Sequence, residues 1–167
     1  MSERPPATDP AHFRKVLGRF PTGVTVVTAM DGDRPTGLAI GSFTSVSLDP
    51  PLVAFLPTKT SSSYTAVENA GAFCVNVMAA DQKALTGVFA SKAEDKFAGV
   101  DWDRTAVTGS PRLAGSLAWI DCKVHAIHDG GDHWIVVGAV QEMDVEDREV
   151  GPLLFYTGAY GTFAPQD

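Results

Sequence analysis

Short strand-like segments separated by turn residues constrain the fold of this chain more than any other feature. The clearest pair covers residues 118–127 and 134–143, which flank the turn His128-Asp129-Gly130-Gly131-Asp132. In the first segment, small or apolar side chains alternate with large or charged ones, as in a half-buried strand. The set expected to face the core is Ala118, Ile120, Cys122, Val124 and Ala126, and the set expected to face outward is Trp119, Asp121, Lys123 and His125. The two segments together predict a β-hairpin.

Similar segments recur along the chain and are joined by a few short helices. Strands are expected over residues 24–29, 37–48, 52–56, 73–78, 153–156 and 159–163. Helical spacing predicts an amphipathic helix that starts at Asp9-Pro10 and ends before Pro21, with Phe13, Val16, Leu17 and Phe20 on one face. Two more short helices are expected: one around Tyr64 and Val67 that stops near Gly71, and one that is capped by Asp81. This pattern predicts a mainly β protein (α+β), built as a closed or nearly closed antiparallel barrel.

Composition narrows the class of protein. A chain of 167 residues with 44% hydrophobic and 20% charged residues fits one globular domain, expected over residues 9–167 after a loose tail over 1–8. The formal charge of −7 and the lack of a basic run argue against nucleic acid as a partner. Cys74 and Cys122 lie in apolar runs, so we expect buried thiols in a reducing compartment. Without a signal peptide or a long apolar run, we expect a cytoplasmic protein that does not enter membranes.

Several standard catalytic motifs are missing from the sequence. There is no dinucleotide-binding GxGxxG, no phosphate-binding Walker A loop, no HExxH, no paired CxxC and no GxSxG. The four histidines are scattered, so we expect no metal site. The sequence therefore predicts no catalytic side-chain set, and a bound cofactor is the natural source of chemistry.

Two polar segments could bind a ligand. Residues 36–51 are rich in glycine, serine and threonine, which let a flat ligand approach the backbone; a polar strand on the barrel exterior is the alternative. Lys59 and the hydroxyls of Ser61, Ser62 and Ser63 precede a predicted helix. A lysine and free N–H groups at a helix start can hold a phosphate, although plain helix capping fits equally well.

Two further segments carry charge or histidine. Residues 89–97 bring Lys92 and Lys96 close to Phe89 and Phe97, although a solvated loop anchored by two aromatic rings would look the same. His133 follows the hairpin turn, where it could reach a ligand or remain inert. Each of these segments alone is a weak indication of function.

The order of these segments closely resembles the flavin reductase domain family, the small reductases of two-component flavin monooxygenase systems. The resemblance runs from Phe13 to Gly161. Its marks are Phe20-Pro21-Thr22-Gly23-Val24, the stretch over 42–51, Lys59 with Ser61 to Ser63, Phe73-Cys74-Val75-Asn76-Val77, Asp95-Lys96-Phe97, Gly131-Asp132-His133, and Phe155-Tyr156 with Gly158 and Tyr160. One departure is Val88, where the family often has a basic side chain.

The resemblance implies an FMN-binding split β-barrel of Greek-key type, dimeric, with flavin at the subunit interface. It implies hydride transfer from NADH or NADPH to FMN or FAD, and delivery of reduced flavin to a partner monooxygenase. Two enzyme alternatives keep the barrel but act on a corrinoid or on pyridoxamine phosphate. The others are a non-catalytic flavin- or haem-binding module and a barrel with no ligand.

The resemblance also implies a set of binding residues and no catalytic side chain. Ser42 to Ser45 would lie along the flavin ring, Lys59 and Ser61 to Ser63 would hold its phosphate, and His133 would support nicotinamide binding. The full cofactor-binding set is Thr36, Gly37, Leu38, Ser42, Phe43, Thr44, Ser45, Lys59, Ser61, Ser62, Ser63, Phe89, Ala90, Ser91, Lys92, Phe97, His133 and Tyr160.

Overall fold

The computed structural model describes Pro6 and residues 9–165. Apart from Pro6, the tail expected over residues 1–8 lies outside these residues. The helices are α1 (Pro10–Leu17), α2 (Ser62–Ala70), the single 3-10 turn η1 (Ala80–Gln82) and α3 (Lys83–Ala90). The strands are β1 (Thr22–Gly23), β2 (Thr25–Asp31), β3 (Arg34–Ile40), β4 (Thr44–Leu48), β5 (Pro51–Phe55), β6 (Ala72–Val77), β7 (Trp102–Arg104), β8 (Pro111–Leu113), β9 (Ala118–Gly130), β10 (His133–Val145), β11 (Leu153–Tyr156) and β12 (Ala159–Thr162).

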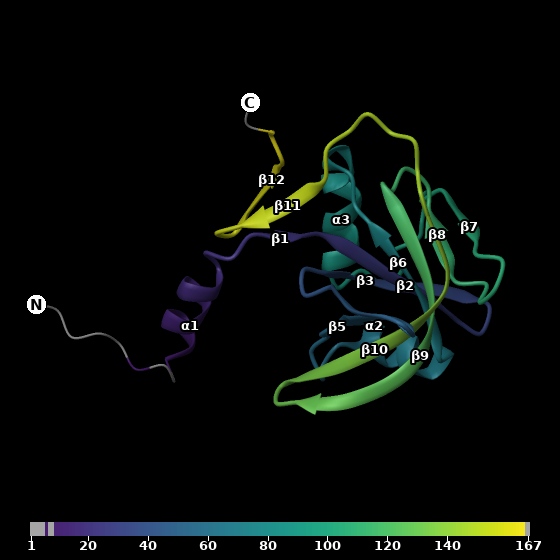
Figure 1. Cartoon of the computed structure of the whole chain (residues 1–167), viewed down its shortest axis with the longest axis horizontal. Helices are drawn as coiled ribbons and strands as arrows, with labels where there is room; N and C mark the ends of the chain where they lie inside the picture. The colour runs from purple at the N-terminus through teal and green to yellow at the C-terminus, as the bar shows by residue number, and fades with distance from the viewer. Residues whose placement is uncertain (1–5, 7–8, 166–167) are drawn as a thin grey trace, which may run out of the picture.

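One seven-stranded antiparallel sheet, in the order β3-β2-β6-β9-β10-β5-β4, forms the body of the protein (Figure 1). Its two edge strands, β3 and β4, are consecutive in the chain and are joined by residues 41–43 alone. In a flat sheet, six strand spacings would separate these edges by about 29 Å. Three connecting residues span at most about 14 Å. The sheet must therefore curve until its edges meet, which confirms the predicted barrel.

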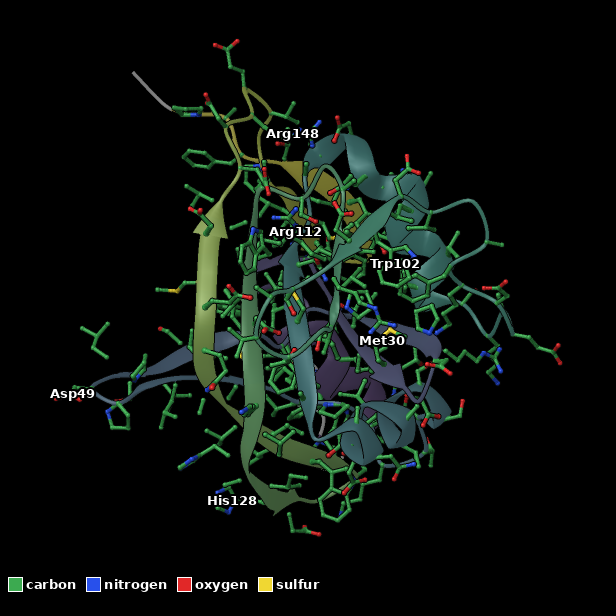
Figure 2. All side chains as sticks on the ribbon, turned by 90° about the vertical axis from the view of Figure 1, so that its right-hand side faces the viewer. Met30, Asp49, Trp102, Arg112, His128 and Arg148 are labelled. Atoms are coloured by element: carbon green, nitrogen blue, oxygen red, sulfur yellow. The ribbon has the colours of Figure 1, made fainter. Side chains whose placement is uncertain are left out.

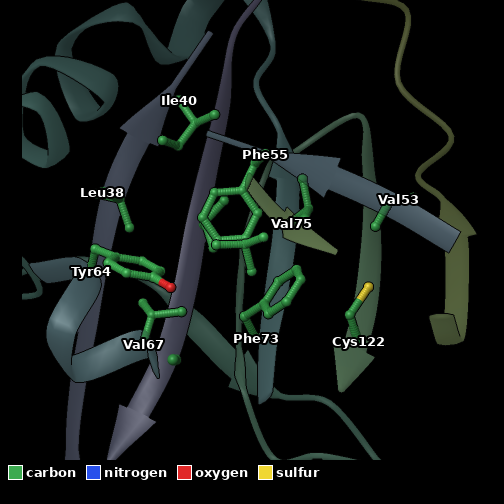
Figure 3. Close-up of a cluster of buried hydrophobic side chains, with 12 residues drawn as sticks. Leu38, Ile40, Val53, Phe55, Tyr64, Val67, Phe73, Val75 and Cys122 are labelled. Carbon is green, nitrogen blue, oxygen red and sulfur yellow. The ribbon is translucent and has the colours of Figure 1, made fainter. Parts of the chain in front are cut away.

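The interior of the barrel is filled by aromatic and β-branched side chains (Figure 3). Phe55 and Phe73 meet edge to face with ring centroids 5.1 Å apart, and Tyr64 and Val67 reach in from α2. Ser61 caps the start of α2, and Gly71 ends the helix with a φ of 65°. The predicted end of the helix near Gly71 is confirmed, and its left-handed conformation suits a residue without a Cβ. The helix begins earlier than predicted, because Ser62 and Ser63, expected before it, form its first turn.

The β9–β10 hairpin is confirmed, but the predicted outward face of β9 is partly wrong. Lys123 and His125 are exposed, whereas Trp119 is only 9% exposed and Asp121 is fully buried. A β7–β8 hairpin that the sequence analysis did not predict carries Trp102 and Arg112 (Figure 2). This hairpin and the loop between its strands cover that face. Thr108 donates to the Asp121 carboxylate through its backbone N–H at 3.0 Å and its hydroxyl at 2.5 Å.

Two other boundaries differ from the prediction. The segment expected as one strand over 37–48 is divided into β3 and β4 by the bend at residues 41–43. Asp81 lies within η1 and forms an ion pair with Arg148 at 2.7 Å, so it does not cap α3.

Helix α1 stands away from the barrel, next to β1, β11 and β12 (Figure 1). It forms as its amphipathic spacing predicts, with Asp9 accepting a hydrogen bond from the Ala11 N–H. No residue of α1 is buried, and Phe13, Val16 and Leu17 are each more than half exposed. Among the described residues, no helix is long and apolar enough to cross a membrane.

Candidate functional site

A groove of about 1410 Å³ lies where five separate segments of the chain meet. They are the start of α1, residues 38–42 at the end of β3, residues 56–58 and 60–63 up to the start of α2, residues 89–93 and 96 at and after the end of α3, and the tip of the β9–β10 hairpin. The volume exceeds the roughly 300–1,000 Å³ of an ordinary small-molecule pocket. The groove therefore has room for more than one nucleotide-sized ligand.

More than half of the predicted binding residues line this groove. They are Leu38, Ser42, Ser61, Ser62, Ser63, Phe89, Ala90, Ser91, Lys92 and His133. Segments that the sequence separates by nearly one hundred residues thus share one surface. Apolar side chains such as Ile40, Leu56 and Phe13 complete the wall. A mixed apolar and cationic lining suits an aromatic ring system that carries phosphate.

The N-terminus of α2 supplies the donors for an anion. The Ser61 hydroxyl accepts a hydrogen bond from the Tyr64 N–H at 3.2 Å and so caps the helix. The first N–H groups of a helix have no partner within the helix and attract negative charge. Ser62 and Ser63 lie at this position, and both line the groove together with Lys92. This end of the groove fits a phosphate group.

Lys96 also lines the groove, although it is not among the binding residues predicted from the sequence. Its ammonium donates to the Phe89 carbonyl at 3.0 Å, the Ser63 hydroxyl at 3.1 Å and the Gly37 carbonyl at 3.2 Å. Burial lowers its pKa. The available signal was the motif Asp95-Lys96-Phe97, in which Phe97 is buried against Phe89 and Lys96 lines the groove.

Several predicted hydroxyls bond to the protein itself. Ser42 donates to the Leu56 carbonyl and accepts from the Leu56 N–H, both at 3.1 Å, which closes the barrel at the bend between β3 and β4. Ser91 donates to the Val88 carbonyl at 2.7 Å at the end of α3. These hydroxyls shape the groove, and the backbone N–H groups and lysines remain the stronger donors for a ligand.

The other predicted residues do not line the main groove. Thr36 and Gly37 line a smaller adjoining hollow of about 280 Å³, which shares Ser62, Ser63 and Lys92 with the groove. The remaining residues lie elsewhere: Phe43 is packed against the barrel core, Thr44 and Ser45 are exposed on β4, Phe97 is buried edge to face with Phe89, and Tyr160 packs against Phe155 on the β11–β12 hairpin.

Lys59 also lies outside the groove lining, which differs from the phosphate contact that the resemblance implies. Its ammonium forms an ion pair with Asp129 and lies 4.4 Å from the ring centroid of Trp134. The hydrogen bond from Lys59 lowers the pKa of the Asp129 carboxyl. Nearby, the Nδ1 atom of His133 lies 2.7 Å from the Asp132 carboxylate, and the histidine lines the groove.

The cysteines carry no reactive chemistry. Cys74 and Cys122 are both fully buried and unpaired. Burial raises the pKa of Cys122 to about 12 and raises that of Cys74 further. Their thiols therefore stay protonated at neutral pH and act as small apolar side chains. Among the described residues, no group of three or more histidine, cysteine or acidic side chains is placed to hold a metal ion.

The curved antiparallel barrel, with a groove lined by apolar and cationic side chains, defines a protein of the split-barrel class. The chain belongs to the flavin reductase like domain family, whose model matches residues 17–164. A flavin reductase from Pseudomonas putida is 54% identical over 95% of this chain and 92% of its own length. The reductase subunit HsaB of a flavin-dependent monooxygenase from Rhodococcus jostii (strain RHA1) is 52% identical over 95% of this chain and 80% of its own.

Solved structures agree with this assignment. The NADH:FAD oxidoreductase SgcE6 of Streptomyces globisporus C-1027, in complex with NAD and FAD fragments, superposes with a TM-score of 0.91. It is 37% identical, over 98% of each chain. The predicted family, the split-barrel fold and the flavin reductase class are therefore confirmed.

Proposed function

We propose that the groove is the place where this flavin reductase passes a hydride from NADH or NADPH to FMN or FAD. The observation that carries the proposal is the shared lining: the N-terminus of α2, Lys92 and His133 all face the same groove of about 1410 Å³. One end that binds a phosphate, together with room for a second nucleotide, is what two stacked nucleotides require.

The residues present fit both nucleotides. The N–H groups at Ser62 and Ser63, with Lys92, would hold the flavin phosphate. Leu38, Ile40 and Phe89 offer apolar contact to a ring system. His133 would hold the nicotinamide nucleotide or its diphosphate; Asp132 engages the Nδ1 atom, which leaves Nε2 for the ligand.

The protein's part in the reaction is to orient its ligands. When both are bound, the reduced nicotinamide supplies a hydride and the flavin ring accepts it. The transfer of a hydride needs no general base, so the groove needs no acid–base pair. Holding two reactants in a productive arrangement can lower a barrier by several kcal/mol. The residues above therefore act by binding and positioning.

The protein is proposed to be a homodimer. Phe13, Val16 and Leu17 of α1 are 56%, 51% and 52% exposed in the single chain, although their spacing forms one apolar face. Leu48 on β4 and Val145 on β10 are 96% and 76% exposed. Apolar residues exposed together on the surface of one chain favour burial against a second copy. Because α1 also lines the groove, a dimer would place flavin close to the subunit boundary.

Light scattering at micromolar concentration tests the dimer. Leu17→Glu on the apolar face of α1 should shift the mass toward one chain, whereas Ala11→Glu on its opposite face should not. A monomeric mass for the wild-type protein would contradict the dimer.

We further propose that the enzyme works in the cytoplasm and supplies reduced flavin to a partner monooxygenase. The partner is suggested by relatives that are reductase subunits of flavin-dependent monooxygenases. Two free, buried cysteines suit a reducing compartment.

Steady-state oxidation of NADH and NADPH, with catalytic amounts of protein and added FMN or FAD, tests the function. Many turnovers per protein that depend on flavin would support it, and the four pairings identify the preferred donor and acceptor. If a folded sample gives no flavin-dependent turnover, the proposal fails. Corrinoid and pyridoxamine phosphate assays would then test the other acceptors, and flavin binding without turnover would identify a carrier.

A further inference from the structure

The tip of the β9–β10 hairpin is supported by a loop from another part of the chain. Strand β5 pairs with β10 only over residues 136–139, so β10 continues past the end of its neighbour toward the tip. Beyond that point the Trp134 N–H donates to the Pro57 carbonyl, and the Lys59 N–H donates to the Asp132 carbonyl, both at 3.0 Å. The loop over residues 57–61 thus takes the place of a missing strand.

Side chains reinforce this support on the same side. The Lys59 ammonium forms an ion pair with Asp129 on β9 and lies 4.4 Å from the ring centroid of Trp134 on β10. The other carboxylate oxygen of Asp129 accepts from the Gly131 N–H at 3.0 Å. One lysine therefore contacts both strands of the hairpin and the turn between them. Only 28% of its side chain is exposed, which leaves little of it to meet a ligand.

These contacts connect the two ends of the groove. Lys59 lies two residues before Ser61, the cap of α2. The hairpin tip that Lys59 contacts carries His133, which lines the groove. A shift of the tip would move His133 relative to the N-terminus of α2. Since a two-stranded ribbon has little stability of its own, the position of the histidine depends on this attachment.

We propose that Lys59 and Asp129 form a clamp that positions His133 for the nicotinamide nucleotide, and that Lys59 does not hold the flavin phosphate. The clamp rests on the proposed function, because it assigns a role to residues around the same groove. Lys59 and Asp129 are positioning residues, and the histidine is the group that meets the ligand.

The two possible roles of Lys59, as a clamp or as a phosphate ligand, predict different effects of Asp129→Asn on ligand affinity. If the clamp is right, Lys59→Met and Asp129→Asn have the same effect: each raises the KM and Kd for NADH by roughly tenfold. Each leaves the Kd for flavin within about twofold, and the double variant is no worse than either single one. Lys59→Arg should restore most of the NADH affinity. If Lys59 holds phosphate instead, Lys59→Met weakens flavin binding and Asp129→Asn does not.

The experiment measures binding of NADH and of FMN or FAD by titration calorimetry, with hydrogen exchange across residues 128–134. Lys123→Met is the matched control, because Lys123 is an exposed lysine on β9, the strand that carries Asp129. Faster exchange at the tip and weaker NADH binding in both clamp variants, but not in the control, are expected. Unchanged NADH affinity in both variants, or loss of flavin affinity in Lys59→Met alone, would overturn the clamp. Since binding and exchange are measured without turnover, an inactive wild-type protein would contradict the proposed function separately.

Discussion

The ammonium of Lys96 donates a hydrogen bond to the Ser63 hydroxyl at 3.1 Å and joins two segments of the groove that lie 33 residues apart. The same ammonium also bonds to the carbonyls of Gly37 and Phe89. One lysine thus holds β3, the start of α2 and the end of α3 around the phosphate end of the groove.

Lys96→Met should therefore reduce both stability and flavin affinity. Removing the ammonium leaves three acceptors without their donor, which costs about 1–3 kcal/mol in the free energy of unfolding. Lys92→Met is the control, since Lys92 is exposed and lines the groove. That variant should lower flavin affinity and leave the urea unfolding midpoint unchanged. Equal midpoints for both variants would show that Lys96 does not hold the segments together.

His133→Ala should raise the apparent KM for NADH or NADPH more than it changes flavin affinity. The physical reason is that His133 lines the groove at the hairpin tip, whereas the groups proposed to hold the flavin phosphate lie at the start of α2 and at Lys92. His128→Ala is the matched control, because His128 is exposed on the same hairpin outside the groove lining (Figure 2). An unchanged nicotinamide KM in His133→Ala would remove the histidine from the binding role.

Much of the fold could be predicted because side chains of different polarity alternate along its long strands and because its helices carry capping residues. Residues 118–143 form the expected hairpin, and α2 ends near Gly71 as expected. The β7–β8 hairpin was missed because its strands have three residues each, too few for a period of two to be visible. The alternation of side chains also predicted that Asp121 faces outward. Alternation separates the two faces of a strand, but it cannot show that a loop from elsewhere in the chain covers one of them.

The candidate site was predicted as segments, and the details depend on tertiary contacts. The order of the motifs predicted that Ser62, Lys92 and His133 belong to one binding site, and all three line the same groove. The roles of Lys59 and Lys96 could not be separated by motif alone. Which lysine faces the groove depends on how the hairpin tip docks on residues 57–61, and that contact joins residues about seventy positions apart.

Gly138→Ala should destabilise the barrel. A Cβ at Gly138 would lie 2.4 Å from the Phe73 ring and 3.1 Å from the Cβ of Cys122. Phe73 is fully buried in the core shown in Figure 3, so it cannot move aside without disturbing Phe55. Overpacking of this kind costs about 1–3 kcal/mol, measured by urea unfolding. Gly161→Ala, where no atom lies within 4 Å, should be close to neutral, and equal effects would contradict this packing.

Buried Asp121 should make stability depend on pH. Burial raises its pKa, so the folded protein keeps a proton that the unfolded chain has already released. The free energy of unfolding therefore falls as pH rises from the ordinary carboxyl pKa to the raised one. Asp121→Asn removes this titration and keeps an acceptor for Thr108. Across a pH series of urea unfolding, its stability relative to the wild type should rise with pH.

Asp33→Asn is the control for this series, because Asp33 is exposed in the turn between β2 and β3. A constant difference between Asp121→Asn and the wild type at every pH would contradict the raised pKa.

If flavin is reduced in the groove described above, a bulky side chain that fills the groove should stop the reaction. Ala90 is exposed at the end of α3 and lines the groove, whereas Ala84 is exposed on the same helix outside the lining. We would measure flavin-dependent oxidation of NADH by the wild-type protein, Ala90→Trp and Ala84→Trp. We expect many turnovers by the wild type and Ala84→Trp, and loss of most activity in Ala90→Trp. Equal rates in all three proteins would contradict it.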